Sequence, residues 1–364
     1  MKRAICLMLA SLMLLSAGCA AAAKKQPLKE IQASIEGLEG ESLRAWCREQ
    51  FASAEHGDPS EIPYPQTRLE NGFLPDGEPE FVYENAEKGL WAYLSQSLQV
   101  QIIRYALPEV PHRWFEAEVI FDPQKESFCQ HVYIKATIKN QMIYPETLAQ
   151  NSKLVFAMNG DYYINRAKQK WPVGNVIRQG TVLYNLPAKR TLKFPNLDTL
   201  AIRNDGSFSV YDGNEISADE LLAQASPGDP AFVHDALAFG PYLVRDGNMR
   251  LYDGSSADAH EPRSAFGMIE PGHLFFVMVE GKMPKKGEQG MDLWQLAELM
   301  YARGCTEAMN IDGGSTAVMV FMGTKLNRTG KGSSLGKPRN QHELFGIGES
   351  ELVHTDMLNG PKKK

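Results

Sequence analysis

The chain has 364 residues, 43% of them hydrophobic, and its formal net charge at pH 7 is −6. This length and composition allow a substantial core and exclude widespread disorder. An acidic chain without a basic stripe also argues against nucleic acid as the main partner, because surfaces that bind nucleic acid are strongly positive.

The first 19 residues are typical of an export signal. Two basic residues are followed by an apolar stretch, Ala4–Leu15, which is too short to span a bilayer. The sequence L-S-A-G-C at residues 15–19 resembles a bacterial lipobox, so Cys19 is predicted to carry a lipid anchor. Ordinary signal-peptidase cleavage within residues 19–23 is the alternative. Either reading predicts an exported protein of the cell envelope, and the first predicts anchoring to a membrane.

Residues 20–78 are predicted to form a tether and a helical N-terminal region. Within residues 28–51, apolar side chains such as Leu43, Trp46 and Cys47 recur at helical spacing. The stretch from residue 56 to 78 is rich in Pro, Gly and acidic residues, as linkers are. We therefore expect one large domain over residues 79–350, followed by a flexible tail over 351–364.

Beyond residue 79 the pattern favours strands over helices. Strands are predicted over residues 90–94, 98–105, 115–121, 132–138, 154–158, 174–183, 199–203, 208–211, 242–244, 263–269, 274–280, 317–322 and 344–347. Helices are predicted near 145–152, after Ser217 and after Asp292, which are suited to be N-caps. The predicted fold is α+β or mixed α/β, a strand-rich single domain with a few helices.

Four polar segments stand at the starts or ends of apolar strands, where a scaffold holds side chains rigidly. They are residues 159–163 (N-G-D-Y-Y), 239–242 (F-G-P-Y), 261–267 (E-P-R-S-A-F-G) and 310–316 (N-I-D-G-G-S-T). In the last, two glycines permit a sharp turn whose N–H groups face an anion. Asp312 could there position a hydroxyl, hold a cation or move a proton. Each segment alone also fits a purely structural turn or ion pair.

In their order, these segments resemble the phosphodiester glycosidase family. Residues 159–163 match its N-G-x-[YF]-[YF] segment, 262–267 look like its P-R-[ST]-A-[IF]-G, and 310–315 are similar to its N-[LI]-D-G-G-[GS] hallmark. Gly174 and the strand and turn at 177–180 match the segment after the first motif. The resemblance covers residues 79–349. It departs from the family at 280–282, at Ser315 and in the closing segment at 339–343.

The resemblance implies a hydrolase that cleaves a sugar-1-phosphodiester, similar to a GlcNAc-1-phosphodiester, in an envelope or extracellular glycan. Arg263 would clamp the phosphoryl oxygens. Asp312 would act as general acid or base, with Asp161 and Glu280 as further catalytic carboxylates, since glycoside hydrolysis commonly uses two. The sequence leaves open which two converge. Predicted substrate-binding residues are Asn159, Gly160, Tyr162, Arg178, Asn310, Gly313, Gly314 and Ser315.

Two alternatives to a hydrolase remain at this stage. One is a non-catalytic glycan-binding lipoprotein that assists exopolysaccharide export. The other is a structural envelope protein, in which Asn159, Asp161, Arg263 and Asp312 would lie far apart. The oxygen-rich loops would also suit a divalent cation such as calcium or magnesium, but no cation-binding motif requires one.

Overall fold

The computed structural model describes residues 28–107, 112–135, 138–139, 141–161, 174–186, 197–213, 215–250, 259–281, 289–330 and 336–358. The segment predicted as an export signal, with Cys19, lies outside this described part, as do the two tyrosines at 162 and 163 and the last six residues. The chain divides into two compact units, residues 1–36 and 37–364, so the boundary predicted near Pro79 falls inside the second. None of the described helices has the length and apolar character needed to cross a membrane.

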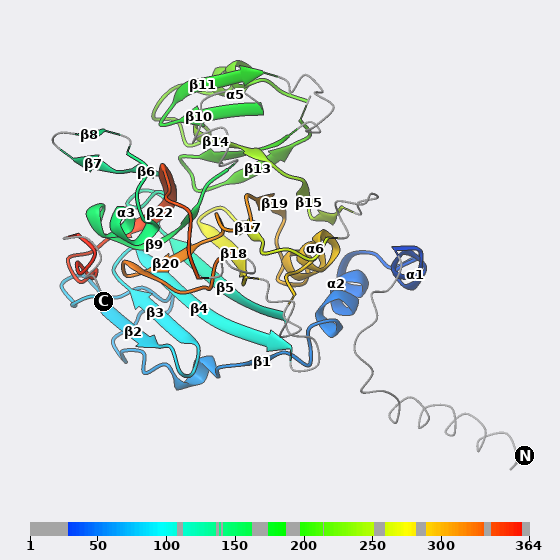
Figure 1. Cartoon of the computed structure of the whole chain (residues 1–364), viewed down its shortest axis with the longest axis horizontal. Coiled ribbons are helices and arrows are strands. Elements are labelled where there is room, and N and C mark those ends of the chain that lie inside the picture. Colours follow the sequence, from blue (N-terminus) through cyan, green and yellow to red (C-terminus); the bar gives the residue numbers. More distant parts are fainter. Residues whose placement is uncertain are drawn as a thin grey trace, which may run out of the picture. The chain divides into compact units, whose positions relative to one another are not determined.

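A ten-stranded sheet, antiparallel at every described pairing, organises the second unit (Figure 1). Its strands, in spatial order, are β16 (Asn248–Met249), β15 (Tyr242–Arg245), β19 (Glu307–Ile311), β17 (Ser264–Glu270), β18 (His273–Val279), β5 (His112–Phe121), β4 (Leu98–Leu107), β3 (Leu90–Leu94) and β2 (Phe81–Asn85), with β1 (Glu55–His56) paired to β4.

Two five-stranded sheets and one short hairpin complete the strands. The β9 sheet has the order β21 (Thr324–Lys325), β20 (Met319–Phe321), β9 (Leu154–Asn159), β22 (Glu343–Glu349) and β6 (Cys129–Val132). The β14 sheet has the order β11 (Thr181–Leu186), β10 (Gly174–Arg178), β14 (Val233–Phe239), β12 (Asp198–Arg203) and β13 (Phe208–Tyr211). The hairpin pairs β7 (Ile134–Lys135) with β8 (Ile138–Lys139).

The described helices are few and short. They are α1 (Leu28–Ser34) in the first unit, and α2 (Gly40–Glu49), the 3-10 turn η1 (Pro59–Glu61), α3 (Pro145–Asn151), α5 (Ala218–Ala223) and α6 (Leu293–Ala302) in the second. Both predicted capping boxes are present: Ser217 caps α5, and Asp292 accepts a hydrogen bond from the backbone N–H of Gln295 (2.8 Å). The prediction of a strand-rich fold with a few helices is confirmed.

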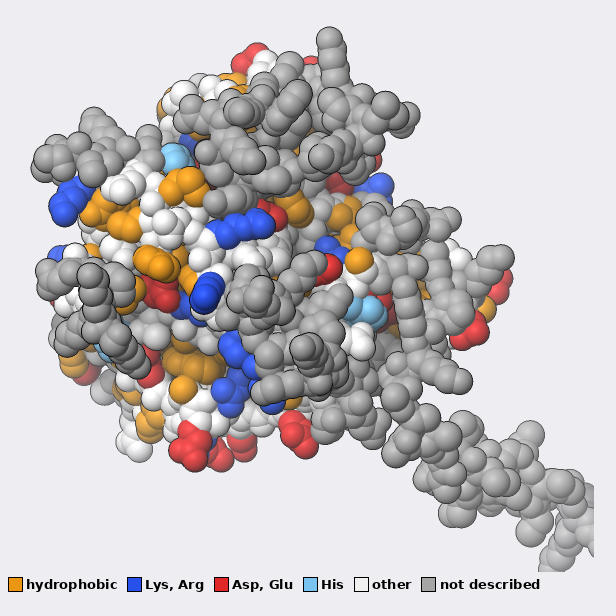
Figure 2. Space-filling view, viewed as in Figure 1, with side chains coloured by type: hydrophobic (Ala, Val, Ile, Leu, Met, Phe, Trp, Pro, Cys, Tyr) orange, Lys and Arg blue, Asp and Glu red, His pale blue; other side chains and the backbone are white. Residues whose placement is uncertain are grey.

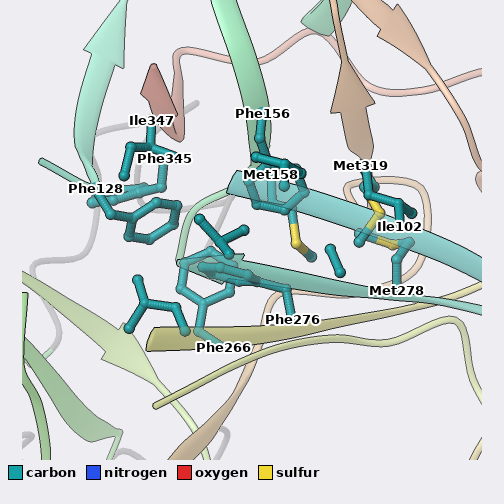
Figure 3. Packing of buried hydrophobic residues seen from close by; sticks show 14 of the residues in the cluster. Ile102, Phe128, Phe156, Met158, Phe266, Phe276, Met278, Met319, Phe345 and Ile347 are labelled. Atoms are coloured by element: carbon teal, nitrogen blue, oxygen red, sulfur yellow. The ribbon is translucent and has the colours of Figure 1, made fainter. Parts of the chain in front are cut away.

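The main core lies between the ten-stranded sheet and the β9 sheet and is aromatic (Figure 3). The Phe276 ring from β18 lies 4.9 Å from that of Phe128, 5.0 Å from that of Phe156 on β9, and 5.2 Å from that of Phe266 on β17, between ring centroids. These tilted and edge-on contacts are favourable beyond the area they bury. The cluster therefore holds the two sheets together.

The other face of the ten-stranded sheet is covered by α6, on which α2 packs. Cys47 of α2 is fully buried there, and the Arg44 guanidinium lies 5.1 Å from the centre of the Tyr301 ring. Glu298 of α6 is 5% exposed in this apolar layer. Its burial has a consequence for stability, because an apolar environment disfavours the charged carboxylate.

Three local predictions differ from the structure. The helix predicted over residues 28–51 is interrupted around Gly37, whose φ of +77° does not continue a helix. The strand predicted over 174–183 is a hairpin that turns at Gly180, with φ +71°. The segment 56–78, predicted as a linker, is folded against the domain, since Ile62 and Leu74 are buried and β1 pairs with β4.

Replacement of the central core ring tests this packing. Phe276→Ala should lower the free energy of unfolding by about 3–5 kcal/mol, because it removes buried surface and leaves a cavity between the sheets. Phe276→Leu should cost about 1–2 kcal/mol. Urea denaturation measures both values. A cost below about 1 kcal/mol for the alanine variant would show that Phe276 is not central to the core.

Glu298 predicts a pH dependence of stability. Burial, and then Asp292, raise the pKa of Glu298 from 4.5 to about 8. Between these values the folded state keeps a proton that the unfolded state releases, so stability falls as the pH rises from 4.5 to 8. Glu298→Gln should therefore stabilise the protein more at pH 8 than at pH 5, as measured by urea midpoints. The exposed Glu49→Gln is the control, and an equal effect of Glu298→Gln at both pH values contradicts the account.

Candidate active site

The predicted catalytic residues Arg263, Glu280 and Asp312 lie at one edge of the ten-stranded sheet. Ser264 of β17 is paired with Ile311 of β19, so Arg263 and Asp312 are the next residues on neighbouring strands. The backbone N–H of Val279 donates to the Arg263 carbonyl (2.8 Å), so Glu280 follows directly at the end of β18, at the same edge. Starts and ends of antiparallel strands meet at the same edge, and this brings together residues distant in sequence.

Both positions after Asp312 require glycine, the first because of a close backbone contact and the second because of its positive φ. A Cβ atom on Gly313 would lie 2.3 Å from the carbonyl oxygen of Pro262, and Gly314 has a φ of +65°. The N–H of Gly314 donates to the same Pro262 carbonyl (3.0 Å). This N–H is therefore already hydrogen-bonded, contrary to the prediction that it binds the ligand. The N–H of Gly313 has no hydrogen-bond partner among the described residues, so it can receive an anion.

Asn159 fastens this turn to the β9 sheet. Its Oδ1 accepts hydrogen bonds from Ser264 Oγ (2.9 Å) and from the N–H of Val318 (3.0 Å). Its Nδ2 donates to the Asp312 carbonyl (2.8 Å). The side chain is fully buried, so the structure gives it a positioning role; its predicted contact with substrate remains a prediction. Gly160 follows, and a Cβ there would lie 2.9 Å from the Phe345 ring.

Arg263 is the most unusual group at this edge. Its Nε donates to the Met291 carbonyl (3.2 Å) and its Nη2 to the Ala259 carbonyl (2.7 Å). Among the described residues no carboxylate lies within 4.0 Å of the guanidinium, and Nη1 has no hydrogen-bond partner. Burial lowers the pKa of Arg263, although Glu261 and Asp292 pull it upward. A desolvated cation with no carboxylate in direct contact among the described residues is suited to bind an anion.

Asp161 and Arg178, predicted as catalytic and substrate-binding, belong to a buried ionic network. Arg178 is 4% exposed, and it donates to both carboxylate oxygens of Glu343, from Nε (3.0 Å) and Nη2 (2.7 Å). Asp161 lies 3.2 Å from Nη2 and also accepts the N–H of Ala238 (3.0 Å). Burial opposes the charge of Arg178, but Glu343 and Asp161 hold its pKa above the usual value.

The network joins β10, β22 and the end of β9, and the sequence prediction missed Glu343. Its signal is weak because it lies in the closing segment 339–343, which matches the family only loosely, and 165 residues separate it from Arg178. A buried guanidinium of this kind is best described as a positioning group. The structure does not bring Asp161 and Arg178 to an exposed surface.

Glu280, Asn310 and Ser315 each make contacts that define their place. Glu280 accepts from Arg328, at Oε1 from the N–H (2.9 Å) and at Oε2 from Nε (3.1 Å) and Nη2 (2.9 Å). Asn310 donates to the Gly240 carbonyl (2.7 Å), while its buried Oδ1 has no hydrogen-bond partner. Ser315 is partly exposed at the turn, as is Asp312.

No group of three or more metal-ligating side chains that could hold an ion occurs in the described ranges. The divalent cation that the oxygen-rich loops would suit thus has no assigned ligands in this part of the chain. Tyr162, predicted to contact substrate, lies outside the described residues.

The antiparallel scaffold thus presents a desolvated arginine, a glycine turn and a carboxylate at one edge, which are groups of the kind that bind anionic esters. The chain belongs to the phosphodiester glycosidase family, because the family's model matches residues 152–347, which contain the motifs described above. The family resemblance read from the sequence is confirmed.

Individual relatives are distant. The chain is 22% identical over 189 residues to the SPbeta prophage-derived uncharacterized protein YomE of Bacillus subtilis, covering 51% of this chain and 27% of that protein. It is 25% identical over 194 residues to the N-acetylglucosamine-1-phosphodiester alpha-N-acetylglucosaminidase of Bos taurus, covering 49% of this chain and 33% of that protein. The matched part therefore spans about a third or less of each relative's length.

A solved structure supports the fold. The zebrafish N-acetylglucosamine-1-phosphodiester alpha-N-acetylglucosaminidase catalytic domain, auto-inhibited by its pro-peptide, superposes with a TM-score of 0.50 at 19% identity. The match covers 82% of this chain and 89% of that one, so the similarity in fold extends over most of both chains.

Removal of one charge from the buried network should be costly. Glu343→Gln leaves the buried Arg178 guanidinium with less compensation, and we expect a loss of about 3–5 kcal/mol in the free energy of unfolding. Glu215→Gln, at the exposed Glu215–Arg245 pair, should cost less than about 1 kcal/mol. Urea denaturation of the two variants measures the difference. Equal costs would contradict the assignment of the network as a structural element.

Proposed function

We propose that this protein hydrolyses a sugar-1-phosphodiester of a glycan, of the kind represented by a GlcNAc-1-phosphodiester. The observation that carries the proposal is Arg263, a desolvated guanidinium without a carboxylate partner, next to the turn of Asp312 and Gly313. A phosphodiester has one negative charge and two unesterified oxygens, which match a guanidinium in shape and sign. Membership of the family supports a hydrolase of this type.

The geometry suggests a division of labour. Nη1 of Arg263 donates to one phosphoryl oxygen and the N–H of Gly313 to another, so that both stabilise charge that develops on the phosphate as the bond breaks. This charge stabilisation needs no movement of either donor, since both belong to elements fixed by the sheet. The arrangement suits departure of the phosphate from the sugar as well as attack at phosphorus.

Asp312 is our choice as the general acid or base. Of the three carboxylates predicted from the sequence, Asp161 and Glu280 are buried and ion-paired with arginines, whereas Asp312 is partly exposed at the edge. A proton-transferring group must reach the substrate, and an exposed carboxylate on a fixed backbone does so. Glu280 then acts by holding Arg328 at the rim of the site.

The proposed setting is the cell envelope. The export signal and the lipobox-like segment support secretion with a lipid anchor at Cys19, and an envelope or extracellular glycan would be within reach of an anchored enzyme. Mass spectrometry of the protein from membranes would detect the diacylglycerol adduct on Cys19 that this setting requires.

Hydrolysis of a methyl GlcNAc-1-phosphodiester tests the proposal. Arg263→Gln should lower kcat/KM at least about 100-fold, because the charge on the phosphate loses its main donor. Asp312→Asn should reduce kcat to a similar extent. Arg245→Gln, a charge removal far from the edge on β15, should leave the rate unchanged. A parallel assay with EDTA determines whether a cation takes part, and ¹⁸O-labelled water shows whether oxygen enters the sugar or the phosphate.

Full activity of the Arg263 and Asp312 variants would refute the assigned roles. Absence of sugar release, together with saturable binding of the diester, would favour the alternative of a non-catalytic glycan-binding lipoprotein.

A further inference from the structure

Residues 289–292, here called the strap, lie against the segment that carries Arg263. The backbone groups of Glu261 and Met291 are hydrogen-bonded to each other in both directions, at 3.1 Å each. Gly290 lies so close that a Cβ atom on it would be 2.0 Å from the Glu261 carbonyl oxygen. The strap leads directly into α6, whose N-cap is its last residue. Its fit against the segment before β17 therefore depends on a residue without a side chain.

Three successive carbonyl groups of the strap accept hydrogen bonds from basic side chains. Nδ1 of His112 donates to the first of them, at Gln289 (3.0 Å). Nδ1 of His260 donates to the next (3.1 Å), and Nε of Arg263 donates to the third (3.2 Å). A carbonyl oxygen can only accept, so each Nδ1 carries a proton. The orientation of the Arg263 guanidinium thus depends on a strap that two imidazole rings help to hold.

The His112 ring lies on the same face of the ten-stranded sheet as Arg263. Trp114 of β5 is paired with Val279, whose N–H donates to the carbonyl of Arg263. Alternate residues of a strand share a face, so His112, two residues before Trp114, is on the face that α6 covers. The His260 ring stacks on it, with ring centroids 5.6 Å apart and 15° between the ring planes. The stacked pair, the strap and the arginine are therefore connected by direct contacts on one side of the sheet.

The stacked pair accommodates a second positive charge poorly. His112 is 2% exposed, and burial lowers its pKa from 6.5. The strap carbonyls and the Asp292 carboxylate oppose this shift, whereas His260 adds to it. Other charged groups around the pair in the described part of the chain are Glu261 and Arg263, and Oδ2 of Asp292 lies 3.9 Å from Nε2 of His260. Two protonated rings in contact would repel each other at short range.

The lowered pKa of His112 gives the contact a pH dependence of known sign. Below 6.5 a ring that has left the fold binds a proton more readily than the ring in place does. The contact of His112 with the strap is therefore at full strength above pH 6.5 and weakens as the pH falls below it.

We infer that His112, stacked on His260, is a positioning residue for Arg263. It holds the strap in the register that orients the guanidinium toward the phosphodiester, and it does so only while its own ring is neutral. This inference rests on the proposed function, because it adds regulation by pH to the same site. Binding of the diester should weaken on mild acidification, although the diester itself keeps its negative charge.

Two neutral replacements of His112 test the positioning role. The amide nitrogen of His112→Asn can take the place of Nδ1 and keep the bond to the strap, whereas that of His112→Gln reaches the place of Nε2 and loses the bond. At pH 7.5 we expect KM for methyl GlcNAc-1-phosphodiester to stay within about three-fold in the first variant and to rise about ten-fold in the second, with kcat nearly unchanged. Similar KM values in the two variants would overturn the inference.

The pH profile of KM is a readout that a merely structural residue would not change. In the unmodified protein KM should rise about ten-fold between pH 7.5 and pH 5.5, and His112→Asn, which cannot be protonated there, should abolish the rise. Other histidines reach the surface, as Figure 2 shows in pale blue. His273→Asn is therefore the matched control: its ring is paired with Glu118 (2.7 Å) at the opposite end of β18, so this variant should keep the rise. A rise that persists in His112→Asn would refute the role of the ring's protonation.

Hydrogen exchange separates this inference from the hydrolase proposal. The N–H groups of Glu261 and Met291 join the strap to the segment that carries Arg263, so their protection reports whether the strap is in place, with no substrate needed. Protection that falls about ten-fold in His112→Gln but not in His112→Asn would support the positioning role even if no diester is hydrolysed. Equal protection in the two variants would overturn that role, whether or not the protein is an enzyme.

Discussion

The side-chain amide of Asn159 is the contact on which the site depends. It links Ser264 of the ten-stranded sheet, the N–H of Val318 that leads into β20, and the carbonyl of Asp312. An aromatic core packs between the two sheets, and this amide also joins them at one end. An amide has both an acceptor and a donor, so no apolar or purely acidic residue could make the same set of bonds. The position of Asp312 follows from it.

Charge compensation explains how the edge can bind an anion although the chain is acidic overall. Carboxylates accompany the buried Arg178 and the partly buried Arg303 and Arg328, and these pairs serve the structure. Arg263 has no such ion-pair partner in the described part of the protein. A guanidinium that is fixed, charged and unpaired keeps most of its attraction for a ligand. The distribution of carboxylates, more than the number of arginines, defines where the site lies.

Local sequence patterns predicted much of this structure, but they could not predict contacts between residues far apart in the sequence. The capping boxes of α5 and α6 and strands such as β3 were readable because each depends on residues within a few positions. The motifs around Arg263 and Asp312 were readable because strand ends carry them. The contact of Arg178 with Glu343 was not, since it joins residues 165 positions apart and has no spacing of its own. The same limit explains why segment 56–78 resembled a linker. Its composition is polar, but Ile62 is buried against Leu90 and Ala92 of β3, which come later in the chain.

The central claim is that a sugar phosphodiester binds at the edge between Arg263 and Gly313. A crystal structure of the full chain carrying Asp312→Asn, soaked with methyl GlcNAc-1-phosphodiester, tests it most directly. The account predicts one phosphoryl oxygen within hydrogen-bonding distance of the Arg263 guanidinium, another at the N–H of Gly313, and the sugar facing residue 312. A diester bound elsewhere, with Arg263 still bonded only to the carbonyls of Met291 and Ala259, would contradict the account.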